Sequence, residues 1–182
     1  MSLFTIIGCG STAKDWIQRG HSIGVNDAYR FGKEFDSLLV CNRPVEFSRL
    51  TDSGETRFQV ITKTPCKNFY SHKSNWAQWF PYWQKIPLVG WYGTLHREQC
   101  YSSNTSPFIA MSLAFHIGAT DIILYGVDFV DHHMFSKEAE NTKLEAGYYM
   151  QLISKMKEQG CRVWLGTNGS YFDNQIELWP NI

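Results

Sequence analysis

Residues 102–133 constrain the fold more than any other part of the chain, because they combine a well-marked helix with a buried strand. Pro107 suits the first turn of a helix, and residues 108–117 leave that helix almost no polar face, which is typical of a buried helix. Gly118 suits the left-handed position that ends a helix. The continuous apolar run 122–125 is typical of a strand covered on both faces. The stretch therefore predicts a helix–strand unit within an α/β sheet.

Such a unit offers two places for chemistry. The amino end of a helix carries free amides and a partial positive charge, which favour an anion such as a phosphate. We expect Thr105 or Ser106 to accept hydrogen bonds from the first of these amides. The carboxyl end of a strand is where open α/β sheets bind ligands. The candidates at the helix start are Ser103, Thr105 and Ser106, and those at the strand end are Asp128, Asp131, His132 and His133.

The amino-terminal segment reads as strand, glycine turn and helix. Residues 3–7 are β-branched and aromatic, residues 8–11 are Gly-Cys-Gly-Ser, and residues 12–18 are expected to be helical. This order is typical of a nucleotide-binding α/β unit, in which glycines let the backbone approach a phosphate. A Gly-x-Gly pair without a third glycine is also common in turns that bind nothing.

Two further strands are predicted at residues 21–25 and 37–41, and an asparagine follows each of them. The amides of Asn26 and Asn42 could read a ribose or a base edge, because an amide both donates and accepts hydrogen bonds. Alternatively, both are turn residues that tolerate unusual backbone angles.

The remaining pattern supports one α/β domain over residues 1–182 with a mostly parallel sheet flanked by helices. Residues 28–33 and 44–50 are expected to be short helices and residues 57–62 a fourth strand. Residues 136–160 are expected to be helical, because apolar side chains recur there at helical spacing, and residues 162–165 form a last strand.

Residues 65–101 interrupt this pattern and are expected to form an irregular, aromatic-rich insertion or lid. Flat aromatic rings could form a wall that binds an acceptor sugar or base. Alternatively, the aromatic residues build a satellite core or an interface between copies of the chain. The tryptophans of this stretch are Trp76, Trp79, Trp83 and Trp91.

The balanced charge, 17 basic against 17 acidic residues, gives no reason to expect a general affinity for nucleic acid or anionic membranes. No run of apolar residues is long enough for a transmembrane helix, and no signal peptide is recognisable. The five cysteines form no C-x-x-C pair. They predict free thiols in a reducing cytoplasm rather than a zinc site.

His132 and His133 are the best candidates for acid–base chemistry, because histidine titrates near neutral pH. Asp128 or Asp131 could orient one of them. The alternative is a surface pair without a role. A metal site built from these four residues would match no standard ligand spacing, and the chain has no D-x-D, G-x-S-x-G or P-loop motif.

Three segments together resemble the bacterial sialyltransferases of the Campylobacter type, and more distantly the 6-hydroxymethylpterin diphosphokinase-like family. Residues 6–11 resemble the first-strand glycine turn. Residues 24–31 and 40–42 are similar to segments carrying two strand-end asparagines. Residues 105–129 resemble the T-S-G, helix, strand and G-[IV]-D-[FY] unit, with Pro107 in place of the glycine.

The resemblance implies a Rossmann-like, GT-A-type sheet and a glycosyltransferase that uses a nucleotide-activated sugar, CMP-sugar above all. It implies no metal and no cofactor, a histidine general base (His132 or His133) with Asp128 nearby, and a small or glycan acceptor as second substrate. The nucleotide-binding residues implied are Gly8, Gly10, Ser11, Asn26, Asn42, Ser103, Thr105, Ser106 and Gly126.

Two other functions stay open on the sequence. One is a magnesium-dependent diphosphokinase-like enzyme that uses ATP, since phosphoryl chemistry needs a cation to neutralise developing charge. The other is a non-catalytic nucleotide- or sugar-binding module, which could form a homo-oligomer through its tryptophans.

Overall fold

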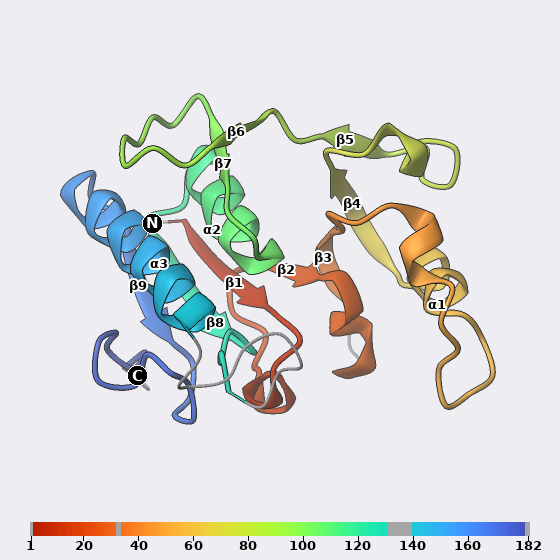
Figure 1. Ribbon diagram of the computed structural model, residues 1–182, viewed down its shortest axis with the longest axis horizontal. Helices are drawn as coiled ribbons and strands as arrows, with labels where there is room; N and C mark the ends of the chain where they lie inside the picture. The colour runs from red at the N-terminus through yellow and green to blue at the C-terminus, as the bar shows by residue number, and fades with distance from the viewer. Residues whose placement is uncertain (1, 32–33, 131–139, 181–182) are drawn as a thin grey trace.

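The computed structural model describes residues 2–31, 34–130 and 140–180. It has a seven-stranded parallel sheet in the order β5-β4-β3-β2-β1-β8-β9, flanked by helices (Figure 1). This confirms the predicted α/β class. The strands are β1 (Leu3–Ile7), β2 (His21–Val25), β3 (Phe35–Leu39), β4 (Cys66–Ser71), β5 (Trp83–Lys85), β8 (Asp121–Tyr125) and β9 (Arg162–Leu165).

The sheet is buried on both faces because neighbouring apolar residues along each strand point in opposite directions. In β1, Ile6 faces one hydrophobic core and Ile7 the other, and neither side chain is exposed. Ile122 and Ile123 of β8 divide in the same way. A continuous apolar run is therefore required in the central strands, as predicted for residues 122–125.

One face of the sheet is covered by α2 (Ser106–His116) and α3 (Glu140–Glu158), which lie in front of β1 and β8 in Figure 1. A small parallel sheet of β6 (Leu88–Gly90) and β7 (Cys100–Ser102) packs on the same core. The buried helix predicted from residues 108–117 is confirmed, since residues 108–115 are all buried. No described helix has the length and apolarity needed to cross a membrane.

The opposite face carries short elements instead of long helices. They are the 3-10 turns η1 (Ser11–Asp15), η2 (Asn26–Phe31), η3 (Pro44–Phe47) and η4 (Ser74–Trp76), and the helix α1 (Arg57–Lys63). η1 and η3 are shorter than the helices expected at residues 12–18 and 44–50, and η2 is a 3-10 turn that begins two residues before the helix expected at 28–33, of which residues 32–33 lie outside the described residues. The five cysteines carry free thiols, as predicted.

The strand expected at residues 57–62 is wrong, because these residues form α1. Thr56 caps the helix, and the side chain of Gln59 reaches back to the Thr56 amide at 2.8 Å. This reciprocal capping box fixes a helical start. Phe58 and Ile61 are three residues apart and pack on the same core, which a helix allows and a strand does not.

The aromatic stretch 65–101 is more regular than expected, because part of it forms β4 and β5 of the main sheet. Trp76 lies at its centre, fully buried, and its indole N–H donates to the carbonyl of Asn42 at 2.8 Å. Its ring contacts those of Phe47, Phe58, Phe69 and Phe80. A core role is therefore confirmed for Trp76.

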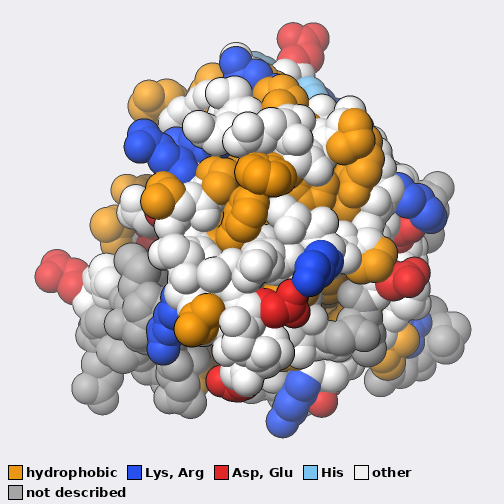
Figure 2. Space-filling view, turned by 90° about the vertical axis from the view of Figure 1, so that its right-hand side faces the viewer, with side chains coloured by type: hydrophobic (Ala, Val, Ile, Leu, Met, Phe, Trp, Pro, Cys, Tyr) orange, Lys and Arg blue, Asp and Glu red, His pale blue; other side chains and the backbone are white. Residues whose placement is uncertain are grey.

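Other aromatic side chains of this stretch stay at the surface. Trp79 is 49% exposed and Tyr82 is 40% exposed. Figure 2 shows the side of the molecule formed by β4, β5 and α1, where hydrophobic side chains gather on the upper part. An interface between copies of the chain at this surface stays a prediction.

We predict that Trp76→Ala destabilises the protein by about 3–5 kcal/mol, because it removes a large buried ring from a packed aromatic cluster. The matched control is Trp79→Ala, which removes an edge-to-face contact with Phe58 and should cost only about 0.5–1.5 kcal/mol. Urea unfolding followed by circular dichroism measures both values. Equal losses in the two variants would contradict the core role of Trp76.

Candidate functional site

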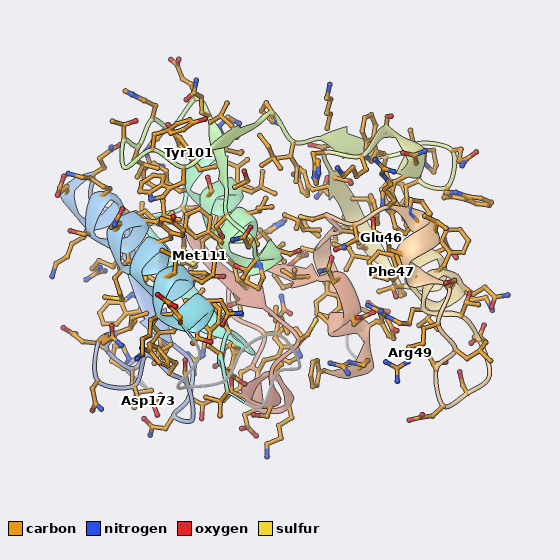
Figure 3. The ribbon with its side chains drawn as sticks, in the orientation of Figure 1. Glu46, Phe47, Arg49, Tyr101, Met111 and Asp173 are labelled. Atoms are coloured by element: carbon orange, nitrogen blue, oxygen red, sulfur yellow. The ribbon has the colours of Figure 1, made fainter. Side chains whose placement is uncertain are left out.

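The candidate site lies at the carboxyl edge of the sheet, where the strand order reverses. From β1 the chain first builds the sheet towards β5, and later adds β8 and β9 on the other side of β1. Open α/β sheets bind ligands at such a switch point. A cleft of about 440 Å³ opens here, lined by the ends of β1, β2, β3 and β8 and by the start of α2. Figure 3 labels Glu46 and Phe47 on its η3 side and Met111 on α2.

The turn after β1 is locked onto the turn after β8. The amide of Gly8 donates to the carbonyl of Tyr125 at 2.8 Å, and that of Gly10 donates to the carbonyl of Gly126 at 2.9 Å. A Cβ on Gly8 would lie 2.3 Å from the Gly126 oxygen, and a Cβ on Gly10 would lie 2.4 Å from an Asp128 oxygen. These glycines therefore let two protein turns approach each other. Gly10 and Gly126 also line the cleft.

Asp128 is the centre of this junction. Its side chain is 3% exposed and accepts hydrogen bonds from the Thr12 amide at 2.8 Å, from the Ser11 hydroxyl at 3.2 Å, and from the Thr12 hydroxyl. The Thr12 hydroxyl oxygen in turn accepts from the Gly126 amide at 2.8 Å. Thr12 is a site residue that the sequence analysis missed. Its only signal was its place directly after the glycine turn.

The predicted general bases, His132 and His133, lie outside the described residues, as does Asp131. Their relation to Asp128 therefore stays a prediction. In the described part of the chain, no three His, Cys, Asp or Glu side chains come together as they would around a metal ion.

Asn26 follows β2 and connects it to the segment after β3 and to the start of α2. Its backbone is left-handed, with φ of 48°, so the turn interpretation is correct for its backbone. Its side chain nevertheless spans the cleft, because Nδ2 donates to the Ser106 hydroxyl at 3.0 Å and Oδ1 accepts from the Cys41 amide at 3.4 Å. Asn42 also lines the cleft, with its Nδ2 donating to Glu46 at 2.8 Å.

The start of α2 differs from the expected cap. Thr105 is the cap residue, but its hydroxyl pairs with the phenol of Tyr149 at 2.7 Å and caps no amide. The physical reason is that Tyr149 is fully buried and its hydroxyl needs a partner. Ser103 supports this turn by accepting from the Thr105 amide at 3.3 Å. The first turn of α2 thus reaches the cleft without a side-chain cap from Thr105. Pro107 has no N–H and the Phe108 amide faces the Tyr149 phenol, so this turn offers an anion mainly the positive end of the helix dipole.

The rim towards α1 carries charge. Arg57 pairs with Asp27 through Nε at 2.8 Å, and its guanidinium lies 4.8 Å from the Phe47 ring centre. Hydrogen bonds from Asn42 and from the Arg43 amide lower the pKa of Glu46. The sequence analysis missed Arg57, because it placed this residue in a strand.

Two further groups in the cleft stay neutral. Burial raises the pKa of the Cys9 thiol to about 11, and its Sγ donates to the Val25 carbonyl at 3.3 Å. Burial also raises the pKa of Tyr149, and the neighbouring Glu145 adds to that effect. Cys9 is therefore a protonated thiol at neutral pH, and a thiolate nucleophile is not available at this position.

We predict that Thr12→Val lowers the free energy of unfolding by about 1–3 kcal/mol, because it leaves the buried Gly126 amide unpaired and removes a donor from Asp128. Ser11→Ala is the control, since Ser11 is exposed and its bond to Asp128 is longer; we expect a loss of about 0.5 kcal/mol. Denaturant titration measures both. A Thr12→Val variant as stable as the parent would contradict the central role of this junction.

Comparison with known proteins adds the fold relationship. No family model matches the chain, and no curated protein matches it. Among solved structures, the sialyltransferase CstII from Campylobacter jejuni, in complex with the substrate analogue CMP-3FNeuAc, matches with a TM-score of 0.58 and 16% identity. That match covers 100% of this chain and 87% of CstII.

Two other solved structures agree. The monofunctional α-2,3-sialyltransferase Cst-I from Campylobacter jejuni matches with a TM-score of 0.61 and 16% identity, over 100% of this chain and 82% of its own. The sialyltransferase CST-II in complex with a trisaccharide acceptor and CMP matches with a TM-score of 0.59 and 15% identity, over 99% and 87%. The chain therefore has the fold of these sialyltransferases.

Proposed function

We propose that this protein is a glycosyltransferase that uses a nucleotide-activated sugar, with CMP as the nucleotide. The observation that carries the proposal is the cleft at the switch point of the sheet, into which the first turn of α2 opens without a side-chain cap. That geometry suits an anion joined to a larger polar group. Solved proteins with the same fold bind CMP and a CMP-sugar analogue, which supports the choice of nucleotide.

In this proposal the nucleotide lies across the carboxyl ends of β1, β2 and β3, beside Gly10, Asn26 and Asn42. Its phosphate lies near Ser106, at the start of α2, and beside Gly126. The remaining predicted residues support this surface. Gly8 and Ser11 hold the first turn against β8, and Ser103 and Thr105 hold the turn before α2.

The proposed reaction is a displacement at the anomeric carbon of the sugar. The acceptor hydroxyl forms the new bond, the bond from the sugar to the phosphate oxygen breaks, and CMP leaves with the electron pair. His132 or His133 takes the proton of the acceptor hydroxyl as general base. Asp128 precedes these histidines in the chain, and its side chain is hydrogen-bonded to the turn after β1. The positive end of the α2 dipole stabilises the charge of the leaving phosphate without a metal ion.

We predict that CMP and CMP-3FNeuAc raise the melting temperature without magnesium, whereas UDP, GDP and ATP do not. A ligand at 100 times its dissociation constant stabilises a protein by about 2.7 kcal/mol, which is readily seen in a thermal-shift assay. Each nucleotide is tested with and without magnesium. Stabilisation by ATP that requires magnesium would favour the diphosphokinase-like alternative, and no shift with any nucleotide would contradict the proposal.

We predict that replacing both histidines, His132→Ala with His133→Ala, lowers the rate of CMP-sugar turnover by about 10²–10⁴-fold while CMP affinity stays unchanged. Turnover is followed as CMP released with a glycan acceptor present, and the single variants identify the base. His96→Ala is the control, because His96 is exposed and does not line the cleft. Unchanged turnover in the double variant would rule out a histidine base at these positions.

A further inference from the structure

A buried carboxylate stands behind the α3 side of the cleft. Glu145 is 1% exposed, and its Oε1 accepts a hydrogen bond from Nδ2 of Asn104 at 2.6 Å. Asn104 itself is exposed and lines the cleft, two residues before the start of α2. This hydrogen bond thus joins an exposed side chain of the cleft to a buried carboxylate on α3.

Glu145 fixes the orientation of the Asn104 amide. A carboxylate oxygen accepts hydrogen bonds, so the atom of Asn104 that faces Glu145 must be the donor Nδ2. The carbonyl oxygen Oδ1 then points away from Glu145. In the described part of the chain no group donates to this Oδ1. Asn104 therefore offers the cleft a hydrogen-bond acceptor of fixed orientation, next to the start of α2.

The buried Glu145 carboxylate is only partly satisfied by hydrogen bonds, which costs stability. Oε2 of Glu145 is buried and has no hydrogen-bond partner among the described residues, and the same is true of Oγ1 of Thr142, one turn earlier on α3. A buried acceptor without a partner costs about 1–3 kcal/mol. Proteins can keep such an unsatisfied group at a functional site. Glu145 combines this cost with a hydrogen bond to a side chain that lines the cleft, which is the observation that points to a role there.

We propose that Asn104 is a sugar-recognition residue and that Glu145 is its positioning residue. Oδ1 of Asn104 accepts a hydrogen bond from a hydroxyl of the sugar ring joined to the phosphate. Two residues of chain span about 7 Å, so Asn104 lies within reach of a ring attached to an anion at Ser106. The inference rests on the proposed use of a nucleotide-sugar, and it predicts that the pair distinguishes the nucleotide-sugar from the free nucleotide.

The test compares the dissociation constants of CMP-3FNeuAc and CMP by isothermal titration calorimetry. Glu145→Gln replaces a partner that only accepts by an amide that can also donate, so the Asn104 amide is no longer held in one orientation and its oxygen faces the cleft for only part of the time. We expect about three- to tenfold weaker binding of CMP-3FNeuAc and unchanged binding of CMP, as for the loss of one hydrogen bond. Asn104→Ala should give the same selective loss. The control is Glu158→Gln, which removes an exposed carboxylate of α3 that pairs with Lys155.

A double variant separates positioning from a structural role. If Glu145 acts through Asn104, Glu145→Gln has no further effect on CMP-3FNeuAc binding in the Asn104→Ala background. The melting temperature of Glu145→Gln should equal or exceed that of the parent, because the variant removes a buried charge. Equal losses for CMP and CMP-3FNeuAc, or a lower melting temperature with unchanged selectivity, would overturn the inference. A parent protein that binds CMP-3FNeuAc no more tightly than CMP would also overturn the inference, whereas a parent protein that binds neither would refute the proposed function itself.

Discussion

The hydrogen bonds between Thr12, Asp128 and the Gly126 amide are the interaction on which the rest of the site depends. They join the turn after β1 to the turn after β8, at the point where the sheet reverses its order. Parallel strands have no hairpin to hold their ends together, so the carboxyl edge needs such side-chain bonds. Because Asp128 is buried, each donor also offsets the cost of burying its charge. These bonds hold the turns after β1 and β8 together beside the cleft.

The same junction changes how the glycine turn is understood. Gly8 and Gly10 lie against Gly126 and Asp128, so their lack of a side chain is already required by the protein's own packing.

A phosphate site needs positive charge, yet Arg57 at the rim is paired with Asp27. The electrostatic attraction for an anion thus falls to the start of α2, where the helix dipole has its positive end.

The sequence predicted those parts of the fold that depend on hydrophobic pattern and on backbone-specific residues. The buried helix α2, the strand β8 and the position of Asn26 at a strand end follow from such patterns. The helix α1 was missed because its alternating residues imitate a strand, and the capping box of Thr56 outweighed that pattern. Glu145 carries no local sequence pattern, and Thr12 has only its place after the glycine turn, since their roles arise from contacts with residues 41 and 116 positions away.

The two walls of the cleft differ in how they are built, and this difference separates their roles. The wall of Gly10 and Gly126 is fixed by backbone hydrogen bonds and close packing of turns, which tolerate few substitutions. The opposite wall is formed by the side chains of Asn104, Thr105 and Tyr149 and is held by side-chain bonds to α3. A wall defined by backbone suits the part of a substrate that stays constant. A wall defined by side chains can change by single substitutions, so under the proposed function the choice of sugar falls to this wall.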